Sequence, residues 1–143
     1  RCAWNRRKAL FQMADRAGCN KLAFGHHADD IVETTLMNLF YTATLRRMDP
    51  KVSFFGGRII VIRPLAYVEE RDIVPFVKAC GFPIHGEPCA EGQSSRRALV
   101  KRVLRELEDD CHGVKRSVFR AVDNHAEHLR RARECGLPDD LAS

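Results

Sequence analysis

The chain has 143 residues, of which 24 are Lys or Arg and 19 are Asp or Glu, giving a formal net charge of +5 at pH 7. Hydrophobic residues make up 45% and charged residues 30%, fractions that exclude a disordered tail, a collagen-like repeat and a coiled coil. No apolar run approaches the roughly 20 residues that a membrane-spanning helix requires, and the N-terminal segment lacks a signal-peptide pattern. We expect a cytoplasmic globular chain that does not enter a membrane.

The first third of the chain predicts a helix, a strand and a second helix. Apolar residues of segment 3–17 repeat at helical spacing. Residues 21–25 form a short apolar run that is typical of a buried parallel strand. The second helix is expected to begin at Asp29 or Asp30, because Asp30 and Glu33 have the spacing of a capping box.

The middle of the chain is expected to contain one strand and one helix. Segment 46–57 includes Pro50 and a pair of glycines, and we predict a loop there. The run Arg-Ile-Ile-Val-Ile at 58–62 is the clearest strand. A third helix is predicted over 72–80, where Pro75 is tolerable only if it lies in the first turn.

The last third is predicted to be irregular over 82–95 and then helical over 96–109 and 114–131. Strands that alternate with helices imply an α/β fold with a parallel sheet. Two strands alone do not bury both faces of such a sheet, so we expect that an N-terminal half is missing or that a partner chain completes the sheet. The chain also begins at Arg1 rather than at a methionine, and we interpret it as a fragment.

The positive charge is confined to the C-terminal segment. Residues 96–133 contain 11 Lys and Arg against 6 Asp and Glu, whereas the charges in the remainder balance. A localised basic excess favours a polyanionic partner, although a solvated helical surface has the same composition. The predicted organisation is an α/β domain, a basic helical extension and a tail, over residues 1–95, 96–131 and 132–143.

The densest group of functional side chains is the segment 25–30, Gly-His-His-Ala-Asp-Asp. It joins a predicted strand to a predicted helix, at the edge where open α/β sheets bind ligands. A helix N-terminus offers N–H groups to phosphate, and carboxylates supply the oxygen ligands that Mg²⁺ prefers. The alternative is that Asp30 only caps the helix and that the histidines are polar loop residues. The candidate nucleotide-binding residues are Gly25, His26, His27 and Asp29.

Two cysteines are candidate metal ligands. Cys2 and Arg6 lie four residues apart on one helical face, where a cation favours the metal-binding thiolate. Cys89 lies in a loop rich in Pro and Gly and is therefore accessible. A frayed basic terminus is the alternative for Cys2. The six scattered cysteines disfavour a disulfide framework and a zinc finger, and most are predicted to be small buried residues.

A basic stripe is predicted on the helix over 96–109. Arg97, Lys101 and Arg105 repeat every four residues, and Arg96 adjoins them. Such a stripe can follow the phosphates of an RNA strand. The alternative is the solvated side of an ordinary helix.

Four strings of residues resemble one family. They are Cys2-x-x-x-Arg6-Arg7, the run Lys-Leu-Ala-Phe-Gly-His-His-Ala-Asp-Asp-Ile-Val-Glu-Thr at 21–34, Leu-Met-Asn-Leu-Phe-Tyr at 36–41, and Val-Ile-Arg-Pro-Leu-Ala-Tyr at 61–67. These strings look like the tRNA 2-thiocytidine synthetase family of the PP-loop (N-type) ATPases, which also include tRNA-Ile-lysidine synthetase. The resemblance extends to about Asn124.

The resemblance implies a PP-loop fold, of the adenine nucleotide alpha hydrolase type, and an ATP- and Mg²⁺-dependent enzyme. Such enzymes adenylate a tRNA base, after which sulfur from a donor displaces AMP. In the iron–sulfur members three cysteines hold a 4Fe-4S cluster, and Cys2 and Cys89 match two of them, so we predict that they approach each other. By the same match Arg6 is a catalytic cation and Asp30 a catalytic acid.

Two departures from the family pattern limit the expectation. The Ser-Gly-Gly-x-Asp-Ser pyrophosphate loop is absent from this sequence, so the isolated chain is expected to bind ATP weakly and not to hydrolyse it. Gly92 stands where the family has a further cysteine, which leaves three-cysteine ligation intact. A noncatalytic RNA-binding remnant, a PP-loop enzyme that modifies another base, and a homodimer stay open as alternatives.

Overall fold

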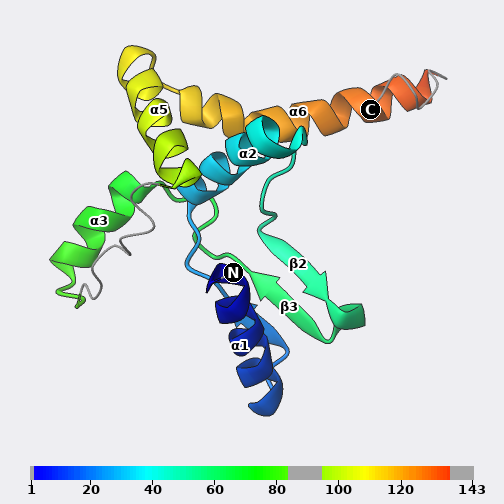
Figure 1. Ribbon diagram of the computed structural model, residues 1–143, viewed down its shortest axis with the longest axis vertical. Coiled ribbons are helices and arrows are strands. Elements are labelled where there is room, and N and C mark those ends of the chain that lie inside the picture. Colours follow the sequence, from blue (N-terminus) through cyan, green and yellow to red (C-terminus); the bar gives the residue numbers. More distant parts are fainter. Residues whose placement is uncertain (1, 84–94, 136–143) are drawn as a thin grey trace. The chain divides into compact units, whose positions relative to one another are not determined.

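The computed structural model describes residues 2–83 and 95–135, apart from the side chains of residues 2, 3, 132 and 133 (Figure 1). The chain divides into two compact units. The first, which we call the sheet unit, comprises residues 1–28 and 48–82, and the second, the helical unit, comprises residues 29–47 and 83–143. The predicted domain limits at 95/96 and 131/132 stay a prediction.

The sheet unit combines a three-stranded sheet with two helices. In chain order its elements are α1 (Cys2–Arg16), β1 (Lys21–Ala23), β2 (Lys51–Phe54), the 3-10 turn η1 (Phe55–Gly57), β3 (Ile59–Ile62) and α3 (Glu70–Ala79). The strand order is β1-β3-β2. β1 pairs parallel to the central strand β3, with Leu22 opposite Val61, and β3 buries Ile59 and Val61.

Strand β2 corrects the prediction of a loop over 46–57. It pairs antiparallel to β3, with Val52 opposite Val61, so the sheet is mixed rather than parallel. Lys-Val-Ser-Phe alternates exposed and half-buried residues, which is the two-residue period of a strand. The two glycines do not mark a long loop, because they form a tight connection between β2 and β3, in which Gly56 has a φ of 64° and Gly57 a φ of 95°.

Helix α1 packs against this hairpin through aromatic rings. The ring of Phe11 lies 5.2 Å from that of Phe54 and 5.5 Å from that of Phe55, distances at which aromatic pairs attract each other. The carboxylate of Asp15 pairs with Arg58 at 2.6 Å. The aromatic contacts hold the helix beside the strands, and the exposed ion pair adds little to them.

Helix α3 begins two residues before the prediction. Pro75 is its sixth residue, so the expectation that this proline lies in the first turn is wrong. A proline at this position lacks the N–H that bonds the preceding turn. The helix begins earlier because Glu70 and Asp72 in its first turn interact favourably with the helix dipole.

The helical unit contains α2 (Ala28–Thr42), α5 (Arg96–Asp110) and α6 (Val114–Glu134). The predicted helices over 96–109 and 114–131 are confirmed, and the Ser95 hydroxyl accepts a hydrogen bond from the Ala98 N–H as the N-cap of α5. Apolar residues at helical spacing on α2 and α5 form one core, whose buried members are Val32, Leu36, Val100 and Leu104. From α6, Val114, Val118 and Phe119 pack against it.

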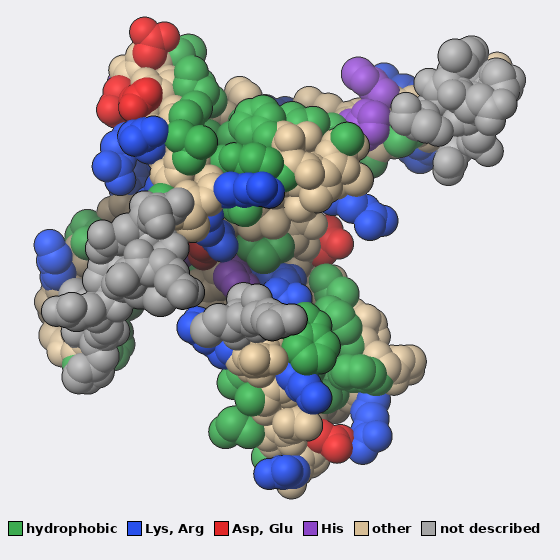
Figure 2. Space-filling view, viewed as in Figure 1, with side chains coloured by type: hydrophobic (Ala, Val, Ile, Leu, Met, Phe, Trp, Pro, Cys, Tyr) green, Lys and Arg blue, Asp and Glu red, His purple; other side chains and the backbone are tan. Residues whose placement is uncertain are grey.

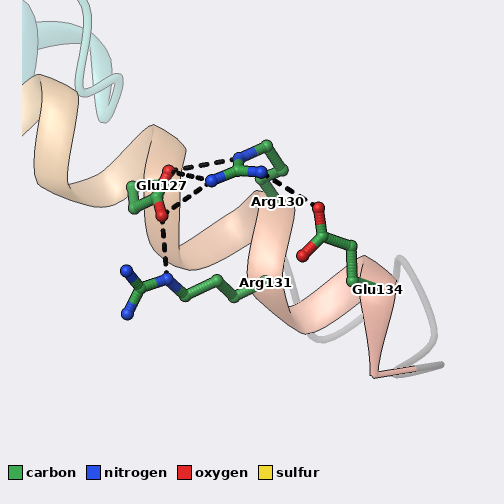
Figure 3. Close-up of polar contacts among 4 residues, drawn as sticks. All are labelled: Glu127, Arg130, Arg131 and Glu134. Atoms are coloured by element: carbon green, nitrogen blue, oxygen red, sulfur yellow. Dashed lines mark hydrogen bonds and ion pairs between the residues drawn. The ribbon is translucent and has the colours of Figure 1, made fainter.

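Helix α6 ends in exposed ion pairs between neighbouring turns (Figure 3). The Arg130 guanidinium bonds Glu127 at 2.7 Å and Glu134 at 3.1 Å. Arg131 bonds the other oxygen of Glu127 at 2.8 Å. All lie three or four residues apart, the spacing at which side chains meet on a helix surface.

None of the helices in the described ranges combines the length and the hydrophobicity that crossing a bilayer requires.

Candidate functional site

The loop after β1 leaves the sheet at the carboxyl ends of two parallel strands. The Phe24 N–H donates to the Ile62 carbonyl at 2.9 Å, and the Ala28 N–H donates to Val68 at 2.9 Å, so both ends of the loop are fixed. A Cβ at Gly25 would meet no atom within 4 Å. The predicted nucleotide-binding residues Gly25, His26 and His27 therefore lie at the edge where open α/β sheets bind ligands.

One cation at this edge of the sheet, Arg63, was not predicted from the sequence to be a site residue. Arg63 follows β3 directly, and its guanidinium donates to the Asp49 carbonyl. Burial lowers the pKa of Arg63, nearby Arg7 lowers it further, and Asp49 opposes both effects. The signal was present in the Ile-Arg-Pro-Leu string, but a strand-ending arginine has no distinctive spacing.

The first turns of α2 carry three carboxylates. Asp29 and Glu33 are buried, and Asp30 is half-buried. Because α2 begins at Ala28, Asp30 lies inside the first turn, and the prediction that it caps the helix is wrong. The earlier start is favourable because it places two negative charges at the positive end of the helix dipole.

Cations from α5 and α6 neutralise these carboxylates. Arg97 bridges two of them, with its Nε 2.7 Å from Glu33 and its Nη2 2.9 Å from Asp30. The Lys115 ammonium lies 2.6 Å from Asp29. All five side chains belong to the helical unit. The packing of its core helices therefore also determines where these five charges lie.

The predicted RNA-binding residues of α5 differ in their surroundings. The Arg96 guanidinium lies over the Tyr41 ring, 4.7 Å from its centroid, which is a cation–π contact. Arg97 faces the carboxylates of α2, Lys101 is half-buried, and Arg105 is exposed. Basic side chains occupy the earlier turns of α5, whereas acidic ones gather at its C-terminal end (Figure 2).

The structure does not describe the side chains of the two predicted metal ligands. The Cys2 backbone is in α1 with exposed Arg6 one turn later, but the Cys2 side chain and all of Cys89 fall outside the described residues. Within the described residues no three His, Cys, Asp or Glu side chains are arranged to hold a metal ion. The predicted approach of Cys2 to Cys89 stays a prediction.

The expectation of mostly buried cysteines is wrong for the four that are described. These are exposed and lie at or just beyond helix C-termini, where the chain turns at the surface: Cys19, Cys80, Cys111 and Cys135.

The family model described as the PP-loop domain matches residues 3–107. This chain belongs to the PP-loop family. The PP-loop family that the motif strings implied is thereby confirmed, and the helices and mixed sheet of the described residues confirm the α/β class.

The PP-loop chain is similar to several tRNA-cytidine(32) 2-sulfurtransferases. It is 42% identical to that of Geobacter sulfurreducens and 43% identical to that of Geobacter metallireducens, each alignment covering 96% of this chain and 56% of the relative. It is 45% identical to that of Azotobacter vinelandii, over 86% of this chain and 45% of the relative. The chain thus spans about half the length of these relatives.

The fold is similar to that of the U34-tRNA thiolase NcsA from Methanococcus maripaludis, solved with its 4Fe-4S cluster. The TM-score is 0.67 at 24% identity, and the alignment covers 89% of this chain and 43% of the thiolase. At that identity the likeness establishes the fold alone.

Proposed function

We propose that this chain is part of an ATP-dependent tRNA thiolase that makes 2-thiocytidine. The observation that carries the proposal is the identity of 42–43% with tRNA-cytidine(32) 2-sulfurtransferases over 96% of the chain. The PP-loop match supports the use of ATP. In this reaction the base is adenylated with release of pyrophosphate, and sulfur from a donor then displaces AMP. A pyrophosphate-binding segment outside the present sequence belongs to the proposal.

In the proposed enzyme the described residues have four roles. Gly25, His26 and His27, at the strand-end edge, bind the nucleotide, with Asp29 beside them in the chain. Asp30 handles the proton of the reacting base as an acid–base group, which needs a fixed carboxylate. Arg6 stabilises negative charge that develops during transfer. Phosphates of the tRNA are bound by cations of α5, namely the exposed Arg96 and Arg105 and the half-buried Lys101.

Mg²⁺ and the iron–sulfur cluster are treated differently in this proposal. Asp29 and Asp30 are each paired with a cation, an arrangement that does not favour Mg²⁺ ligation, so no step is assigned to Mg²⁺ at these carboxylates. Cys2 and Cys89 are proposed ligands of a 4Fe-4S cluster, which would supply a site for sulfur transfer when bound. Iron and sulfide analysis of the Cys89→Ser variant, purified without oxygen, tests this ligation independently of activity.

The main test compares modified nucleosides of tRNA by mass spectrometry. A strain lacking the gene is expected to lose 2-thiocytidine, and the full-length wild-type protein to restore it. Unchanged 2-thiocytidine in the deletion strain would contradict the proposal. Loss of another modified nucleoside in the same chromatogram would favour a PP-loop enzyme with a different base, and tRNA binding without any loss would favour an RNA-binding remnant.

A second test concerns ATP. Calorimetry on the 143-residue chain is expected to give weak or no ATP binding, because the pyrophosphate loop is not in this sequence. Tight, Mg²⁺-dependent binding by this chain would show that the strand-end edge suffices for the nucleotide.

A further inference from the structure

Arg97 lies on a turn of α5 that is supported by a helix cap and by the core of the helical unit, with its side chain 43% exposed. Its helix is capped two residues earlier by Ser95, and Val100, three residues later, is buried against α2 in the core. Side chains on such a supported turn keep their orientation. The contacts of Arg97 are therefore determined by the packing of α5 on α2.

The two carboxylates that Arg97 bridges are not equivalent. The side chain of Glu33 is 6% exposed, whereas that of Asp30 is 24% exposed. Glu33 accepts from Nε, and Asp30 accepts from Nη2 through its side chain and, at 3.4 Å, through its carbonyl. The buried glutamate thus fixes the guanidinium, and the guanidinium fixes the more accessible aspartate.

We propose that Arg97 is a positioning residue that orients the Asp30 carboxylate, with Glu33 as its anchor, rather than a phosphate contact of the tRNA. The inference rests on the proposed thiolation, in which Asp30 is the acid–base group. Its chemical logic is that of a reactive group oriented by a second residue, which a third holds in turn. A planar guanidinium suits this role because its rigid fork bonds two carboxylates at once, whereas an ammonium is a point charge.

The test uses the full-length protein and single-turnover thiolation of tRNA, with tRNA affinity measured separately. Arg97→Gln is expected to lower the rate at saturating tRNA by roughly 10- to 100-fold, the effect typical of losing a group that orients a functional residue. The tRNA Kd is expected to change by less than about twofold, and Arg97→Lys to recover part of the rate.

Arg130→Gln is the matched control, because Arg130 also bridges two carboxylates, on the exposed surface of α6. It is expected to leave the rate and the Kd unchanged. Thermal unfolding of each variant shows how much protein is folded, and rates are compared per folded molecule. Should Arg97→Gln prove too unstable, Arg97→Lys alone carries the comparison with the control.

Four results overturn the inference. A weaker Kd with a smaller salt dependence and an intact rate makes Arg97 a phosphate contact, for which the salt slope falls by about one. A lower melting temperature with an unchanged rate per folded molecule makes it purely structural. A wild-type protein that does not thiolate tRNA overturns the proposed function and this role together, whereas an active wild type with a fully active Arg97→Gln overturns only the role of Arg97.

Discussion

Two arginines of the helical unit each bridge two carboxylates, but only one joins separate helices. Arg97 of α5 reaches Glu33 and Asp30 of α2, which precede it by 64 and 67 residues. Arg130 reaches Glu127 and Glu134, three and four residues away on its own helix (Figure 3). The side chain of Glu33 is 6% exposed and that of Glu127 is 37% exposed.

The difference shows that similar distances carry different consequences. Solvent screens the exposed pairs, which typically contribute little to stability. A buried carboxylate that loses its cation is costly, because it has already lost its hydration. The ion pairs around the start of α2 therefore stabilise the packing of the helices, whereas those at the end of α6 lie on the surface of a helix that forms without them.

The largest effect is expected for Asp30, the more exposed of the two carboxylates that Arg97 bridges. In the full-length protein, Asp30→Asn should reduce the proposed thiolation by roughly 10²- to 10⁴-fold, as for a lost acid–base group, because it removes the carboxylate charge. Single-turnover assays with Glu134→Gln, at the exposed bridge, provide the control. A fully active Asp30→Asn protein would reduce Asp30 to a partner of Arg97 with no chemical role.

Local patterns in the sequence predicted much of the fold. The helices of residues 96–109 and 114–131 follow from apolar spacing, with Ser95 as a clear cap. The run 58–62 follows from its isoleucines. Strand β2 was missed because it is four residues long and bounded by Pro50 and a glycine pair, which are also the signals of a loop.

The ion pairs of the candidate site were beyond such patterns. Arg97 was assigned to a basic stripe from its spacing with Lys101 and Arg105, yet its partners lie on a helix more than 60 residues earlier. Lys115 and Asp29 are 86 residues apart. A helical repeat tells which side chains share a face, but only tertiary packing tells what that face meets.

The second largest effect is expected for the Lys115–Asp29 pair. Lys115→Met should destabilise the chain by about 2 kcal/mol, less than for a fully buried pair because Lys115 is one-third exposed. The double variant Lys115→Met/Asp29→Asn should recover part of the loss, since the buried charge is removed as well. Denaturant titrations measure both, and Arg130→Met is the exposed control. Equal effects of Lys115→Met and Arg130→Met would abolish the distinction between the two regions.

A smaller, pH-dependent effect is expected at the junction of α5 and α6. The Glu108 carboxylate accepts from the N–H groups of Lys115 and Gly113, each at 2.8 Å. These two hydrogen bonds, of which the one from Lys115 has the larger effect, lower the pKa of Glu108 below its ordinary value of 4.5. At pH values between the folded-state and unfolded-state pKa of Glu108, the unfolded chain binds more protons than the folded chain. The contribution of the Glu108 carboxylate to stability is therefore complete above pH 4.5 and is lost as the pH falls through the folded-state pKa.

Glu108→Gln should therefore cost about 1 kcal/mol at pH 7, as for a lost helix cap, and progressively less as the pH falls below 4.5. Unfolding titrations at several pH values check this, with Asp109→Asn, an exposed neighbour, as the control. A cost that stays constant with pH would mean that the carboxylate charge is irrelevant to the cap.

The smallest effect on stability is expected at the exposed bridge itself. Hydrogen bonds from Arg130 and then Arg131 lower the pKa of Glu127. An NMR titration of the Glu127 carboxyl should therefore give a midpoint below that of an ordinary glutamate, and either Arg130→Gln or about 1 M salt, which shortens the screening length to roughly 3 Å, should raise it. Arg130→Gln should not change the melting temperature measurably, because the folded-state gain of the pair is offset by the entropy of holding long side chains. A clear drop in melting temperature for Arg130→Gln, with the helical core intact, would show that local exposed pairs contribute to this fold as much as those that join its helices.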